Sequence, residues 1–198
     1  MIEEIIQREW EFLQETQNID GRASCQDNFE LFHLYRKSQF MTFTKELLEN
    51  YLQDMKDYKR IGLNPISLKY AYMMESNDPQ GYANIEQYVP KVNQETNGII
   101  EEIVAIELTM MEQFEKLYPA ISYASRNTYS SSDSEDETSF ETYLRGELKT
   151  YSKKTLVSYA YMVLDASSQD KNLVLLIREN TVKMYGYQSL EQAEEKLK

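Results

Sequence analysis

Apolar residues recur at helical spacing along almost the whole chain, and this periodicity is the strongest constraint on its fold. Near the start, the spacing i, i+3, i+4, i+8, i+11 places one apolar stripe on a helix. A longer pattern begins after Asn93 and ends before Pro119. We therefore predict an all-α protein. The first stripe consists of Ile2, Ile5, Ile6, Trp10 and Leu13, and the longest of Ile99, Ile100, Ile103, Val104, Met110, Met111, Phe114 and Leu117.

Capping residues and helix breakers divide the pattern into separate helices. Asn64 followed by Pro65 is a start signal, because the amide side chain can cap a helix whose first position suits proline. Thr138 and Glu141 form a T-x-x-E capping box, which predicts a helix start there. The run LVLLI at 173–177 fits either a buried strand or a helix. We expect an irregular bundle of eight to nine helices.

The chain length fits a single helical domain, residues 1–198. A domain of this size buries about 70 % of the surface of its unfolded chain, so it can form a core without disulfides or metal. The segment 122–137, SYASRNTYSSSDSEDE, is polar, acidic and without periodicity. We predict that it is a mobile acidic loop within the domain.

The formal net charge of −12 argues against two classes of partner, nucleic acids and anionic membranes. Nucleic-acid binding driven by the phosphate backbone needs a basic surface, and so does binding to an anionic membrane. Cys25 is the single cysteine, so no intramolecular disulfide can form. The first ten residues do not resemble a signal peptide, and the longest apolar run, 156–164, is too short to span a bilayer. We therefore expect a cytoplasmic protein.

Familiar catalytic templates find no match. The chain contains one histidine, His33, and no Glu-x-x-His motif, which disfavours di-iron and zinc sites. It contains no G-x-G-x-x-G, P-loop or G-x-S-x-G motif. A magnesium site built from carboxylates is left open, but no metal ligand is assigned and the cofactor is unknown.

Three charged residues fall on otherwise apolar helix faces. Glu147 projects between Tyr143 and Tyr151, Arg36 lies among phenylalanines, and Lys69 lies on a helix that is apolar nearly all round. A carboxylate in such a place needs a partner, a raised pKa or access to water, because unpaired burial costs several kcal/mol. Two interpretations follow. One is a buried ion-pair network that fixes the register of the helices, and the other is a polar pocket that binds a small ligand.

The chain also resembles a family of small bacterial proteins classed as a domain of unknown function. The resemblance covers almost the whole chain and lies in GRASCQDN at 21–28, YRKSQF at 35–40, KYAYMMES at 69–76 and SFETYLRGELKTYS at 139–152. It implies a helical, cytoplasmic protein and no particular reaction. The motif residues that it implies are Arg22, Cys25, Gln26, Asp27, Arg36, Gln39, Lys69, Tyr70, Glu141, Tyr143, Arg145, Glu147 and Tyr151.

Three hypotheses for function follow. The first is a helical binding module whose polar Arg/Lys/Glu/Tyr pocket takes a small ligand or a partner protein. The second is an enzyme that uses a carboxylate or Cys25, with or without a divalent cation, and the third is a structural or regulatory subunit with a buried ion-pair network. The oligomeric state is unknown. The candidate ligand-binding residues are Arg22, Asp27, Arg36, Gln39, Lys69, Tyr70, Tyr143, Glu147 and Tyr151.

Overall fold

The computed structural model describes residues 1–17, 21–22 and 24–198, and these fold into an all-α protein without strands. They form eleven α-helices, more than the eight to nine expected, and three 3₁₀ turns. The α-helices are α1 (Ile2–Glu15), α2 (Phe29–Phe40), α3 (Lys45–Ile61), α4 (Pro65–Asn77), α5 (Pro79–Ile85), α6 (Gln94–Leu117), α7 (Pro119–Tyr123), α8 (Phe140–Leu148), α9 (Lys153–Ser168), α10 (Leu173–Met184) and α11 (Leu190–Leu197).

Two of the short helices begin at a proline. Pro119 ends the apolar pattern of α6 but also opens α7, because the fixed φ of proline suits the first position of a helix. Pro79 opens α5 in the same way. The run at 173–177 is helical, since it forms the start of α10.

Side-chain caps set most helix starts. The Asn64 side chain accepts hydrogen bonds from the backbone N–H groups of Ile66 and Ser67 at the start of α4. The cap of α8 is Ser139 and not Thr138, since the Ser139 hydroxyl accepts from the N–H of Thr142 at 3.2 Å. The predicted T-x-x-E box was therefore wrong by one residue.

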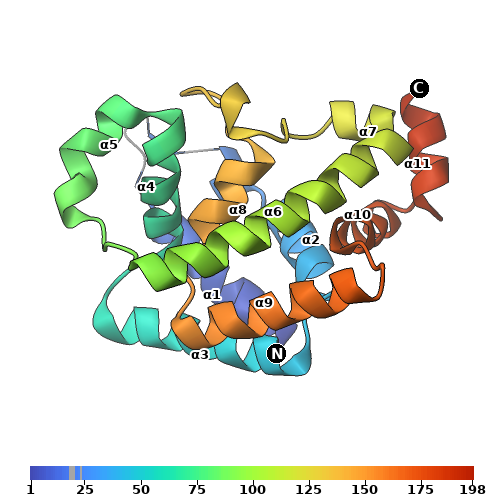
Figure 1. Cartoon of the computed structure of the whole chain (residues 1–198). Coiled ribbons are helices and arrows are strands. Elements are labelled where there is room, and N and C mark those ends of the chain that lie inside the picture. The colour runs from blue at the N-terminus through green and yellow to red at the C-terminus, as the bar shows by residue number, and fades with distance from the viewer. Residues whose placement is uncertain (18–20, 23) are drawn as a thin grey trace.

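The helices pack in crossing layers around one core (Figure 1). The long helix α6 runs diagonally across the molecule and packs against α8, α9 and α10. Helix α1 packs against α2, α3 and α4, and α8 lies between α4 and α6. Large side chains with almost no exposed surface fill the interior, among them Ile5, Phe40, Leu47, Met111, Phe114 and Leu148.

Gly146 allows α8 to approach α4 closely. A Cβ atom at this position would lie 2.7 Å from Cγ of Met73 and 3.1 Å from the carbonyl oxygen of Lys69. Both distances are shorter than normal contacts, so a larger residue would push the two helices apart. This close contact sets the positions of the charged residues on α4 and α8.

The acidic segment 122–137 makes several contacts with the helices. Asp133 accepts hydrogen bonds from the hydroxyl of Ser76 on α4 and from the N–H of Ser139. The N–H of Ser130 donates to Glu141 on α8 at 2.7 Å. These bonds attach the segment to two helices, while its mobility in solution stays a prediction. Among the described residues, no helix combines the length and the apolar character needed to cross a membrane.

Candidate functional site

Glu147 on α8 forms ion pairs with residues from two other helices. Its Oε1 lies 3.2 Å from Nη2 of Arg36 on α2, and its Oε2 lies 3.6 Å from Nζ of Lys69 on α4. All three side chains are at most 8 % exposed. The three residues that helical projection marks as polar on apolar faces therefore meet inside the protein.

Glu9 on α1 completes the network from the other side of Arg36. Its carboxylate accepts hydrogen bonds from Nε and Nη2 of Arg36 at 2.7 and 2.6 Å, which is the two-pronged geometry that guanidinium and carboxylate groups favour. The hydroxyl of Tyr51 on α3 donates to the same carboxylate at 2.6 Å, and Tyr151 donates to Glu147 at 3.2 Å. Five helices, α1, α2, α3, α4 and α8, thus contribute to one buried cluster, together with Tyr151, which follows α8.

Positive and negative charges alternate through this cluster. Burial raises the pKa of the Glu147 carboxyl, but the positive charges of Arg36 and Lys69 outweigh burial and lower that pKa to about 2. Burial also opposes the charge of Arg36, yet Glu147 and Glu9 hold its pKa well above the ordinary value. The cluster thus places two acidic side chains, Glu9 and Glu147, against two basic ones, Arg36 and Lys69.

The edge of the cluster lies at Tyr143 and Gln39, which are partly exposed. Nζ of Lys69 donates to the Tyr143 hydroxyl at 2.8 Å, and Nη1 of Arg36 donates to Oε1 of Gln39 at 2.7 Å. Lys69 also lies 5.6 Å from the ring centroid of Tyr70. The described part of the chain has no buried side-chain nitrogen or oxygen without a hydrogen-bond partner, so the cluster is internally satisfied.

The structure divides the nine candidate residues into two groups. Arg22 and Asp27 do not join the cluster: they pair with each other at 2.6 Å near the protein surface. The side chain of Cys25 lies outside the described residues. Ligand binding by the clustered residues stays a prediction, because their polar atoms already bond to one another. The residues that do come together are Arg36, Gln39, Lys69, Tyr143, Glu147 and Tyr151, with Tyr70 beside Lys69.

Sequence analysis missed Glu9, although the signal was present. Glu9 lies four residues after Ile5 and three before Phe12, so the same projection places it on the buried face of α1. Trp10, which we assigned to that stripe, is only partly buried and packs against Phe29 and Phe32.

Glu107 on α6 is a second buried carboxyl that sequence analysis missed. It lies four residues after Ile103 and three before Met110, both buried. Its carboxyl is 2.7 Å from the hydroxyl of Tyr159 on α9. Burial raises the pKa of Glu107 to about 7, because no cation compensates the loss of water as Arg36 does for Glu147.

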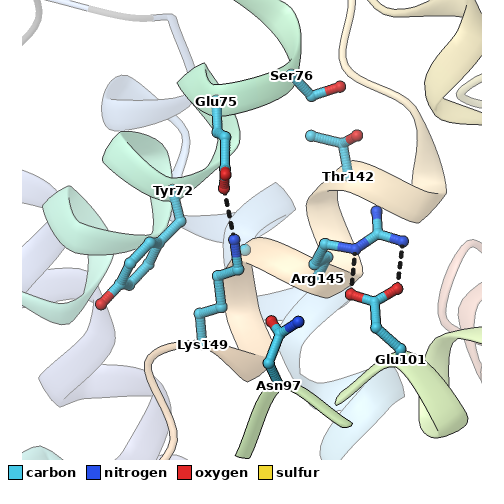
Figure 2. A pocket seen from close by; sticks show the side chains of 9 residues that line it. Tyr72, Glu75, Ser76, Asn97, Glu101, Thr142, Arg145 and Lys149 are labelled. Atoms are coloured by element: carbon cyan, nitrogen blue, oxygen red, sulfur yellow. Dashed lines mark hydrogen bonds and ion pairs between the residues drawn. The ribbon is translucent and has the colours of Figure 1, made fainter. Parts of the chain in front are cut away.

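A solvent-exposed groove of about 300 Å³ lies on the outer side of α8, between α4 and α6 (Figure 2). Two ion pairs line this groove. Nζ of Lys149 lies 2.7 Å from Glu75 of α4, and Arg145 makes two hydrogen bonds of 2.8 and 2.9 Å to Glu101 of α6. Asn97 lies on the α6 wall between the two cations (Figure 2). Sequence analysis did not predict this groove, since its walls come from three separate helices.

The described residues contain no group of three or more His, Cys, Asp or Glu side chains arranged to hold a metal ion.

Comparison with protein families gives one match, which spans residues 1–195 and is described as "Protein of unknown function (DUF4125)". The chain belongs to the DUF4125 family. The match contains all the segments on which the sequence resemblance rests, and both the buried cluster and the groove lie within it. No curated protein and no solved structure matches the chain. The DUF4125 family therefore supplies a classification without an activity, and function has to be argued from the geometry.

Proposed function

We propose that this DUF4125 protein is a helical binding module that takes a small polar molecule in the groove between α4, α6 and α8. The observation that carries the proposal is the groove itself: a hollow of about 300 Å³ that contains two ion pairs. This volume lies at the lower end of the range for small-molecule sites. The proposal keeps the binding-module hypothesis and moves the binding site from the buried cluster to the groove.

The charges in the groove favour a ligand that carries both an anionic and a cationic group. Arg145 and Lys149 can each bind a carboxylate, and Glu75 and Glu101 can each bind an ammonium group. The existing pairs are partly exposed, with Glu75 and Glu101 at 55 and 45 %. The two cations are more enclosed, with Lys149 and Arg145 at 10 and 24 %, so a ligand would approach these pairs from the side of the carboxylates.

The buried cluster then has a supporting role. Tyr143 and Glu147 on α8 point toward the cluster. Arg145, also on α8, and Lys149, which follows it, line the groove. Ion pairs from Glu147 to α2 and α4 fix the rotation of α8, which in turn fixes the direction of the two groove cations. This is the structural interpretation of the ion-pair network, applied to a nearby binding site.

Catalysis has weaker support than binding. Glu107 is the carboxyl whose pKa of about 7 would suit general acid–base chemistry. It is 3 % exposed, bonded to Tyr159 and not among the residues that line the groove. A molecule in the groove would not reach it, so we propose binding without a chemical step.

A thermal-shift screen with zwitterionic compounds, namely free amino acids and dipeptides, tests the proposal. At least one compound should raise Tm, and Arg145→Gln should abolish that rise because it removes the anion contact. Lys153→Gln is the matched control, since Lys153 pairs with exposed Glu95 and does not line the groove. Lys149→Gln provides a second groove variant if Arg145→Gln weakens the fold.

Two results would overturn the proposal. One is a screen in which no zwitterion raises Tm. The other is a ligand whose effect persists undiminished in both Arg145→Gln and Lys149→Gln.

A further inference from the structure

The segment 128–138, which we call the strap, is bonded to each of the three helices that form the groove. On α6, Glu112 accepts a hydrogen bond from the hydroxyl of Tyr129. On α4, the side-chain amide of Asn77 donates to the hydroxyl of Thr138 at 2.7 Å. A carboxylate in the middle of the strap bonds to both α4 and α8. The strap therefore passes over the three helices from one side of the groove to the other.

That carboxylate belongs to Asp133. Its Oδ2 accepts hydrogen bonds from the hydroxyls of Ser76 on α4 at 2.6 Å and Thr142 on α8 at 2.5 Å. Its Oδ1 accepts from the N–H of Ser139, the cap of α8, at 2.7 Å. Ser76 and Thr142 both line the groove and lie next to each other at one end of it (Figure 2). Asp133 thus joins two helices of the groove at that end.

The strap also connects to a cation of the groove. The N–H of Ser130 donates to Glu141 on α8 at 2.7 Å, and the other carboxylate oxygen of Glu141 accepts from Nη2 of Arg145 at 2.9 Å. Arg145 pairs with Glu101 in the groove through the same guanidinium group. A ligand that binds Arg145 and a strap that holds Glu141 therefore act on one side chain.

Asp133 is the residue whose loss should release the strap. Partial burial raises the pKa of the Asp133 carboxyl, but its hydrogen bonds with Ser76, Thr142 and Ser139 outweigh burial and lower that pKa. Asp133 is therefore charged at neutral pH, and its hydrogen bonds are of the stronger, charge-assisted kind. Residues 134–137, which follow it, are exposed and open more easily than the packed helices below.

We infer that the strap closes the groove at the end marked by Ser76 and Thr142 and thereby limits the length of the ligand. The inference rests on the proposed function, since it concerns the ligand of the same groove. A zwitterion that fits the groove binds with the strap in place, whereas one that extends toward Thr142 meets Asp133. The negative charge of Asp133 also repels a carboxylate at that end. A longer ligand therefore needs the strap to open.

Ligands of different length test this closure. The amino acid or dipeptide that raises Tm most is extended with alanine to a tetrapeptide, in one compound at its amino end and in another at its carboxyl end. At least one tetrapeptide should bind the wild-type protein about tenfold or more weakly than the parent compound, because its added residues meet the strap. Asp133→Ala should bind that tetrapeptide about tenfold or more tightly than the wild type does. Isothermal titration calorimetry measures these affinities.

Hydrogen–deuterium exchange shows whether the strap opens when no ligand is present. Asp133→Ala should speed exchange within 128–138 by about tenfold or more, because it removes three hydrogen bonds, and should leave α9 to α11 unchanged. Asp136→Ala is the matched control, since it removes the same charge from an exposed position of the strap. It should change neither the exchange nor the ligand length. Asp133→Asn, which keeps the shape of the side chain, replaces Asp133→Ala if the alanine variant does not fold.

The possible failures of this inference and of the proposed function differ. If no compound raises Tm, the proposed function is overturned and the inference falls with it. If the wild-type protein binds both tetrapeptides as tightly as the parent compound, only the inference is overturned. The same holds if exchange in the strap is unchanged in Asp133→Ala, or if it is faster but the variant still rejects the same tetrapeptide.

Discussion

Glu9 on α1 and Arg36 on α2 face each other through two parallel hydrogen bonds of 2.6 and 2.7 Å, with side chains 1 and 8 % exposed. Arg36 also binds Glu147, so a single guanidinium group pairs with two carboxylates from helices far apart in the sequence. Arg36 is therefore the residue that joins the two carboxylates of the buried cluster.

Replacing Arg36 with methionine should destabilise the protein strongly. The substitution leaves the carboxylates of Glu9 and Glu147 buried without their shared cation, and breaking a buried pair in this way costs about 3 to 5 kcal/mol. Urea denaturation followed by circular dichroism measures the change. Arg60→Met, which removes a surface pair, should change stability by less than about 0.5 kcal/mol. A loss below about 1 kcal/mol for Arg36→Met would show that the cluster does not hold the helices together.

Replacing Glu107 with glutamine should stabilise the protein at pH 8 and have little effect at pH 4. The pKa of Glu107 is raised to about 7 in the folded protein from 4.5 in the unfolded chain, so the folded state holds the proton more tightly. Stability from this group is therefore full below pH 4.5 and is lost as the pH rises to about 7. Glutamine stays neutral and avoids that loss.

The expected gain for Glu107→Gln at pH 8 is about 1 to 3 kcal/mol, given 1.36 kcal/mol for each pKa unit. Denaturation curves at a series of pH values measure it. Glu102→Gln, an exposed change on the same helix, should show no such pH dependence. An effect of Glu107→Gln that is equal at pH 4 and pH 8 would contradict the raised pKa.

Alanine should have opposite effects at two helical glycines. Gly146→Ala places a Cβ atom 2.7 Å from Met73 and 3.1 Å from the carbonyl oxygen of Lys69, so it should destabilise the fold by about 1 to 3 kcal/mol. Gly98→Ala, on α6, meets nothing within 4 Å and should stabilise by about 0.5 to 1 kcal/mol because alanine favours the helix. Thermal unfolding compares the two variants, and changes of the same sign would contradict the close packing of α4 and α8.

The helices could be predicted from the sequence because their signals are local. The cap at Asn64 and the apolar stripe of α6 each depend on residues a few positions apart. The same projection identified Arg36, Lys69 and Glu147 as polar residues on buried faces, and it would have found Glu9 and Glu107 if applied to charged residues throughout the chain. The errors were also local: the cap of α8 moved by one residue, and Pro119 opened a helix that we had not counted.

The sequence by itself determined that this chain is helical, that it belongs in one family, and that certain charged side chains had to be buried. Only the tertiary structure decided which of them meet. A periodic pattern specifies the face of a helix but not its neighbour, and the choice of neighbour depends on contacts such as Gly146 against Met73. The groove arises in the same way, because its walls come from separate helices that pack together.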